Sequence, residues 1–128
     1  MALRLDWDRD GHDWPHREAS QFVDAGGLRW HVQRFGRKAS PATATEVAPL
    51  ALLLHGTGAS VHSWYPMLPW LRPHFDLLLV DLPGHAFTGM ASAWQASLPG
   101  MALAVRSLLD VLAVPPTLLI GHSAGPAL

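Results

Sequence analysis

The residues that could do chemistry in this chain gather near its end, in the string Gly121-His122-Ser123-Ala124-Gly125. It directly follows the apolar run at residues 117–120, and a G-x-S-x-G string behind a strand predicts a serine on a tight strand-to-helix turn. Glycines suit such a turn because the strand and helix backbones approach closely there. We therefore expect Ser123 to be a nucleophile, the alternative being an ordinary turn serine.

Two further loops carry polar residues behind apolar runs. Residues 50–54 are followed by His55-Gly56-Thr57-Gly58-Ala59-Ser60, and residues 75–80 by Asp81-Leu82-Pro83-Gly84-His85-Ala86. Acyl transfer needs backbone N–H donors about 3 Å from the developing oxyanion. The N–H of Ala124, at a helix N-terminus, is one natural donor, and that of Thr57 is the expected second.

The remaining pattern predicts the elements that must position these loops. Two strands at 20–24 and 28–35 flank Ala25-Gly26-Gly27, which is a hairpin signal. Alternation in the second strand predicts a buried face and a solvent face, the latter carrying Arg29, His31 and Gln33. The runs at 50–54, 75–80 and 117–120 are continuous and apolar, as in parallel strands covered on both faces.

Two helices are expected between these apolar runs. One spans residues 98–112 at helical apolar spacing, with Ser97 as N-cap and Pro99 in its first turn. A shorter one at 64–71 is kinked by Pro66 and Pro69. Strands and helices that alternate in this way predict an α/β fold, in which an antiparallel hairpin precedes a parallel βαβαβ sheet. Residues 1–19 are interpreted as an irregular N-terminal arm and residues 20–128 as the N-terminal half of a single domain.

These motifs, in this order, resemble the N-terminal half of the α/β-hydrolase superfamily. Longer strings resemble one branch, the magnesium-chelatase-associated hydrolases of bacteriochlorophyll synthesis. They are the stretches at 13–20 and 26–33, residues 53–60 with His62-Ser63-Trp64, and Asp81-Leu82-Pro83-Gly84-His85. The resemblance implies a serine hydrolase acting on an ester, thioester or C–C bond, with a small apolar or tetrapyrrole-related substrate and magnesium chelatase as a partner.

The chain departs from the pattern of this family in two respects. The acid and base of a serine triad follow the serine in this fold's chain order. Only five residues follow Ser123, so we expect the chain to be an N-terminal fragment, inactive by itself. Ala86 stands where the family usually has a glycine, at a cost of about 1 kcal/mol if φ is positive there. The alternative to catalysis is a tetrapyrrole-handling or chelatase-assisting factor that keeps the fold as a scaffold.

Other candidate residues receive structural interpretations. We expect His55 and His85 to anchor loops and His122 to pack behind its strand rather than line a pocket. His12 and His16 have a proline between them and no carboxylate that completes a metal motif, so neither a metal nor a cofactor is expected. Trp30 and Trp70 are assigned to the core, whereas Trp64 and Trp94 are candidates to line an apolar pocket.

Composition excludes several classes of function. Hydrophobic residues make up 49% of the chain and charged residues 15%, so it can bury a substantial core. The net charge is −1 with no basic block, which argues against nucleic acid as a partner. There is no cysteine, and hence no disulfide or thiol nucleophile. No apolar stretch reaches the ~18 residues of a membrane span and no signal peptide is visible, so a cytoplasmic location is expected.

Overall fold

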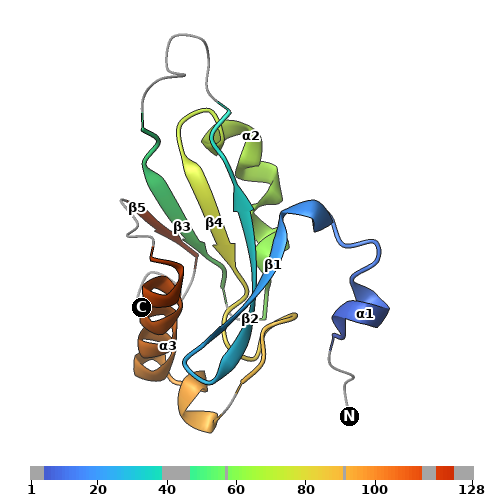
Figure 1. Cartoon of the computed structure of the whole chain (residues 1–128), viewed down its shortest axis with the longest axis vertical. Helices are drawn as coiled ribbons and strands as arrows, with labels where there is room; N and C mark the ends of the chain where they lie inside the picture. Colours follow the sequence, from blue (N-terminus) through green and yellow to red (C-terminus); the bar gives the residue numbers. More distant parts are fainter. Residues whose placement is uncertain (1–4, 39–46, 57, 91, 114–117, 123–128) are drawn as a thin grey trace.

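In the computed structural model of Figure 1, the described residues form one five-stranded sheet with helices on both faces. The structure describes residues 5–38, 47–56, 58–90, 92–113 and 118–122. The strands are β1 (Ser20–Ala25), β2 (Leu28–Phe35), β3 (Leu50–Leu54), β4 (Asp76–Val80) and β5 (Leu118–Gly121), in the spatial order β1-β2-β4-β3-β5. The α/β class, the hairpin and the parallel sheet predicted from the sequence are confirmed.

Strand directions follow from the connections. β1 and β2 pair antiparallel as a hairpin, with Gly26 and Gly27 at φ values of 60° and 78° that favour glycine. β2 runs antiparallel to β4, whereas β3 pairs parallel with both β4 and β5. The β3 run lies at its predicted bounds, and β4 begins one residue later than predicted.

The long helix α3 (Leu98–Leu112) covers one face of the sheet (Figure 1). Its predicted cap is confirmed, since the Ser97 side chain accepts the Gly100 N–H at 3.1 Å, and a proline occupies the first turn. Even-numbered side chains of β3, Leu52 and Leu54, pack in one buried cluster with Val105 and Leu108 of this helix. This cluster forms the larger half of the core.

The opposite face is covered by a less regular segment. A 3₁₀ helix, η2 (Val61–Met67), leads into the single α-helical turn α2 (Leu68–Leu71), where the sequence predicted one kinked helix. Pro66 and Pro69 remove the amides that a continuous α-helix would use. Odd-numbered residues of β3, Ala51 and Leu53, pack in the cluster that holds Trp64 and Leu68.

The N-terminal arm lies against the outer part of the sheet. It contains a helical turn, α1 (Trp7–Asp10), and a 3₁₀ turn, η1 (Arg17–Ala19); a third 3₁₀ turn, η3 (Ala93–Ala96), precedes α3. The Trp7 ring packs against the rings of Phe22 and Phe87, with centroids 5.3 and 4.9 Å away. Arm residues therefore cover side chains of β1 and of the loop after β4.

The structure corrects the burial predicted for two residues of β2 and for one residue of α2. His31 and Gln33, assigned to a solvent face of β2, are both 0% exposed, because the arm and η2 cover that face. Trp70, assigned to the core, is 78% exposed on α2, because it points away from the cluster that takes up Leu68. Trp30 is fully buried as predicted. Within the described ranges, none of the helices is both long and apolar enough to cross a membrane.

Candidate active site

Three loops begin at the same level of the sheet, at the carboxyl ends of its three parallel strands. Leu54 of β3 pairs with Val80 of β4 on one side and with Gly121 of β5 on the other. The next residues along each strand are therefore His55, Asp81 and His122. The carboxyl edge of such a sheet is where ligands bind in open α/β folds. The sequence motifs thus meet at one place.

The three residues expected to carry the reaction, Ser123, Thr57 and Ala124, lie outside the described residues. Their roles as nucleophile and oxyanion donors remain predictions. The structure does describe their immediate neighbours. Gly56 is the second residue after β3 and directly precedes Thr57. The backbone N–H of His122 donates to the Leu54 carbonyl at 3.1 Å, which extends the β3–β5 pairing up to the residue before Ser123.

A cavity of about 530 Å³ opens between the first and third loops. Its size falls within the usual range for small-molecule sites. Residues of η2, of the loop after β3 and of the end of β5 line it: Gly56, Ala59, Ser63, Trp64, Met67, Ile120, Gly121 and His122. The cavity therefore adjoins the residues that precede both Thr57 and Ser123.

Of the two tryptophans expected to line a pocket, only one is found in the described cavity wall. Trp64 lines the cavity, while Trp94 is 56% exposed and is absent from the described cavity wall. His122 was expected to pack behind its strand, which is wrong: it is exposed and contributes to the cavity. β5 is the last strand of the sheet on that side, so the described residues provide no further strand to cover it.

His55 ties the first loop to the second. Its Nε2 accepts the backbone N–H of Leu82 at 2.9 Å, so Nδ1 carries the proton and donates to the Gly56 carbonyl at 2.7 Å. The ring is fully buried, and burial lowers the pKa of His55 below its usual value. Both ring nitrogens are used in holding loops together, which confirms the anchoring role expected for His55.

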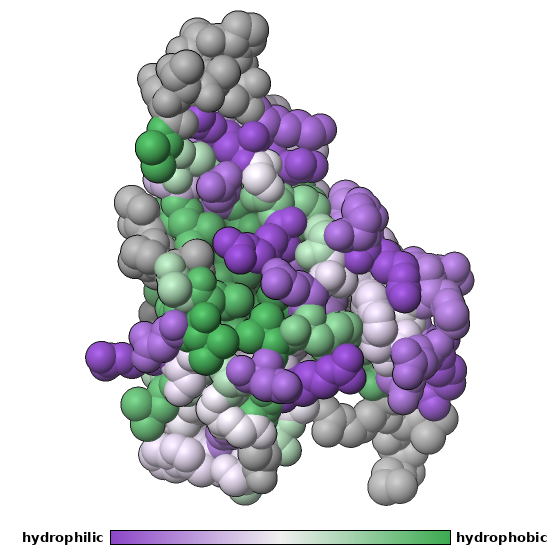
Figure 2. Space-filling view, in the orientation of Figure 1, coloured by the Kyte–Doolittle hydropathy of each residue, from purple (hydrophilic) through white to green (hydrophobic). Residues whose placement is uncertain are grey.

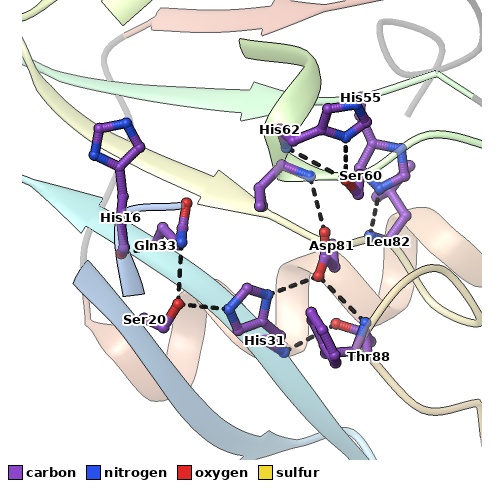
Figure 3. Close-up of polar contacts among 12 residues, drawn as sticks. His16, Ser20, His31, Gln33, His55, Ser60, His62, Asp81, Leu82 and Thr88 are labelled. Atoms are coloured by element: carbon purple, nitrogen blue, oxygen red, sulfur yellow. Dashed lines mark hydrogen bonds and ion pairs between the residues drawn. The ribbon is translucent and has the colours of Figure 1, made fainter. Parts of the chain in front are cut away.

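A second buried network surrounds Asp81, which is 0% exposed (Figure 3). Its Oδ1 accepts the Val61 N–H at 2.9 Å, and its Oδ2 lies 2.7 Å from Nδ1 of His31. The other nitrogen of His31 lies 2.8 Å from the hydroxyl of Ser20. The Asp81 carboxylate therefore links the start of η2, on the cavity wall, to the hairpin.

Sequence reasoning missed this network. Ser20, His31 and Asp81 have the residue types and the hydrogen-bond order of a nucleophilic triad. The Ser20 hydroxyl also receives a hydrogen bond from Gln33 Nε2 at 3.0 Å, and all three residues are absent from the described cavity wall. The signal in the sequence was the pair His31 and Gln33, two polar residues two apart in the second predicted strand. The alternation pattern assigned both side chains to the solvent face.

The loop after β4 carries the departure at Ala86. Its φ is +44°, in the region that favours glycine, so the strain expected for an alanine is present. His85, one residue earlier, places Nδ1 3.0 Å from the Pro83 carbonyl, a contact within its own loop. In the described ranges, three or more His, Asp or Glu side chains never gather as metal ligands would.

Comparison with known proteins follows the same pattern. The family model described as alpha/beta hydrolase fold matches residues 49–128, which include all three loops. The magnesium-chelatase 30 kDa subunit of Rhodobacter capsulatus is 37% identical over 116 residues, which are 91% of this chain and 38% of that protein. The (E)-2-((N-methylformamido)methylene)succinate hydrolase of Acinetobacter baylyi is 31% identical over 74 residues, 58% of this chain and 28% of that protein.

Solved structures share the fold. Cfl2 of Burkholderia cenocepacia superposes with a TM-score of 0.71 at 22% identity, over 84% of this chain and 33% of that chain. An epoxide hydrolase of Vigna radiata gives 0.69 at 23% identity, over 84% and 32%. The chain thus spans less than two fifths of the length of each of these four proteins. With the family model matching more than half of its residues, this chain belongs to the alpha/beta hydrolase fold family.

Proposed function

We propose that this chain is the N-terminal part of a longer serine hydrolase. The longer protein is called the complete hydrolase below. The proposal rests on one observation. The three parallel strands end at the same level of the sheet, beside a cavity of about 530 Å³. Such an edge is where this fold presents a nucleophile. The chain covers only 38% of its chelatase-named relative, which leaves room for the triad acid and base further along.

In the proposed reaction, Oγ of Ser123 attacks the carbonyl carbon of an ester or thioester. Its proton passes to a histidine supplied by the later part of the complete hydrolase, which then protonates the leaving alcohol or thiol. The backbone N–H groups of Thr57 and Ala124 stabilise the oxyanion. Water then hydrolyses the acyl-enzyme. Cleavage of a C–C bond next to a carbonyl would use the same nucleophile and the same donors, and the histidine would then protonate the leaving carbon.

The cavity wall supports an apolar group on the substrate. Trp64, Met67 and Ile120 present apolar surface, while Ser63 and His122 add polar groups to the lining. A small apolar or tetrapyrrole-related acyl group fits this chemistry. The proposal includes a cytoplasmic location, with magnesium chelatase as the expected partner.

Hydrolysis of p-nitrophenyl butyrate by the complete hydrolase tests the proposal. Ser123→Ala should lower kcat/KM at least about a thousandfold. Ser107→Ala is the matched control, because this hydroxyl donates to the Leu103 carbonyl within α3, away from the cavity. Hydrolysis that survives Ser123→Ala, or that falls equally in Ser107→Ala, would overturn the assignment of the nucleophile.

A second candidate function is favoured by the name of one relative, a subunit of magnesium chelatase. In this alternative the fold is a scaffold that assists the chelatase or handles a tetrapyrrole. Pigment accumulation in the producing organism separates the two. Under the scaffold alternative, Ser123→Ala leaves pigment unchanged while Gly125→Val, which would disrupt the predicted turn, lowers it. Under the hydrolase proposal both substitutions lower pigment to a similar extent.

A further inference from the structure

Part of the cavity wall is formed by η2, a segment whose own hydrogen bonds hold it weakly. η2 runs for seven residues as a 3₁₀ helix and contains Pro66. Runs of 3₁₀ helix longer than three or four residues are uncommon because their hydrogen bonds are poorly aligned. Ser63 and Trp64, which line the cavity, belong to this segment. Its position must therefore depend on contacts from outside it.

Two such contacts hold η2 at points four residues apart. At its start, the Val61 N–H donates to Asp81 Oδ1 at 2.9 Å. Further along, the Tyr65 hydroxyl lies 2.7 Å from Gln33 Oε1 and 3.1 Å from the Pro15 carbonyl. Ser63 and Trp64 lie between these two anchors. Burial raises the pKa of Tyr65 to about 12, so the hydroxyl keeps the proton that it donates.

The two side chains that accept these hydrogen bonds, Asp81 and Gln33, are joined to each other by one chain of hydrogen bonds (Figure 3). Asp81 Oδ2 contacts His31 Nδ1, and His31 Nε2 contacts the Ser20 hydroxyl. Gln33 Nε2 donates to that hydroxyl at 3.0 Å. A carboxylate only accepts hydrogen bonds, so His31 Nδ1 donates to Asp81 in this chain.

The arm is bound to the same network. Gln33 Nε2 lies within hydrogen-bond distance of the Pro15 carbonyl at 3.0 Å and the His16 carbonyl at 3.2 Å. Unpartnered buried polar groups are costly, so two fully buried polar side chains in an apolar strand need such partners. These contacts account for the burial of His31 and Gln33 on the face that the sequence assigned to solvent.

We propose that the hydrogen-bond network of Ser20, His31, Gln33 and Tyr65, with His31 and Gln33 as its central positioning residues, fixes η2 in place. The network thereby holds Ser63 and Trp64 as the substrate-facing part of the cavity wall. The arm forms part of this support through the backbone carbonyls of Pro15 and His16. The positioning role itself is independent of the reaction. Its effect on substrate choice rests on the proposed hydrolase function, so two measurements are needed, of which only the second depends on that function.

The first measurement is amide hydrogen exchange of the complete hydrolase, in Tyr65→Phe and Ser20→Ala. Each substitution removes one hydroxyl of the network. Exchange in peptides covering residues 61–67 should rise about three- to tenfold, the factor that one hydrogen bond is worth, while peptides from β3 and β4 stay unchanged. Ser107→Ala is the matched control, and Ser20→Thr, which keeps the hydroxyl, should restore slow exchange. Unchanged exchange at 61–67, or a rise of equal size throughout the sheet, would overturn the proposal.

The second measurement compares p-nitrophenyl octanoate with p-nitrophenyl acetate. A displaced wall affects the ester whose chain reaches Trp64, so Tyr65→Phe should raise KM for octanoate about three- to tenfold and leave KM for acetate and both kcat values unchanged. Equal losses on both esters would contradict a positioning role. If neither ester is hydrolysed by the unsubstituted protein, the proposed function fails, and the exchange measurement alone decides the role of His31 and Gln33.

Discussion

The Nε2 atom of His55 accepts the backbone N–H of Leu82 at 2.9 Å, and this bond joins the first residue after β3 to the second residue after β4. The bond exists only while Nε2 is unprotonated. The loop expected to supply one oxyanion donor is thereby held against the neighbouring loop by a neutral histidine. A titratable group in such a position gives the stability of the fold a predictable pH dependence.

Acid should weaken the fold through His55. Burial lowers the pKa of His55 in the folded state below its ordinary value of 6.5, so the unfolded chain takes up this proton first. The contribution to stability is complete above pH 6.5 and is lost as pH falls from there through the lowered pKa. In urea unfolding of the complete hydrolase between pH 5 and 8, the free energy of unfolding should rise with pH. This rise should be smaller in His55→Gln. His74→Gln, at an exposed position, is the control. If His55→Gln left the pH dependence of the free energy of unfolding unchanged, the result would contradict this account.

Glycine should be better than alanine at two positions. Ala86 and Ala113 have φ values of 44° and 54°, where a Cβ atom meets backbone. Ala113 directly follows α3 as its C-cap, a place where a left-handed residue commonly closes a helix. Ala86→Gly and Ala113→Gly should each raise the free energy of unfolding by about 1 kcal/mol. Ala104→Gly, in the middle of α3, should lower it by about as much. Loss of stability in Ala86→Gly would argue against the left-handed conformation.

Two tryptophans near each other in sequence should behave in opposite ways. Trp64 is buried in the cluster under η2, whereas Trp70 is 78% exposed. Trp64→Ala should cost about 3–5 kcal/mol of unfolding free energy, as large-to-small substitutions in cores do. Trp70→Ala should change it by less than about 0.5 kcal/mol. Denaturant unfolding of the two variants checks this, and similar losses in both would show that the burial assignment is wrong.

Much of the fold was predictable because local patterns agree with it. The apolar run at Leu50–Leu54 and the capped helix Leu98–Leu112 were each predicted at their observed bounds. A continuous apolar run needs cover on both faces, and the clusters on either side of β3 provide it. These elements bury their side chains against neighbours that the same periodicity predicts, so sequence and structure agree there.

The network around Asp81 could not be predicted in the same way. The burial of His31 depends on the arm, which packs there through aromatic contacts of Trp7, and periodicity within one strand says nothing about such cover. The same holds for Trp70, whose exposure depends on how Pro66 and Pro69 direct the chain from η2 into α2. For Ser123, Thr57 and Ala124 the structure adds the surroundings, and their roles remain predictions.

The 128-residue chain expressed by itself should associate and show no esterase activity. β5 is the outermost described strand on its side of the sheet, and its Leu118 and Leu119 are 39% and 45% exposed. Figure 2 shows apolar side chains gathered near the middle of the face that it displays. An uncovered apolar edge is a template for association, and Leu119→Lys should reduce it. Light scattering after size exclusion checks this; a monodisperse monomer that hydrolyses p-nitrophenyl butyrate through Ser123 would contradict the fragment proposal.

The most direct test of the serine hydrolase proposal is covalent labelling of the complete hydrolase with a fluorophosphonate. Such a probe reacts with a serine that a neighbouring base activates, and mass spectrometry of the digested protein locates the adduct. The proposal predicts one adduct on the peptide that contains Ser123, absent in Ser123→Ala and present in both Ser20→Ala and Ser107→Ala. An unlabelled folded protein, or an adduct on Ser20 in place of Ser123, would contradict it.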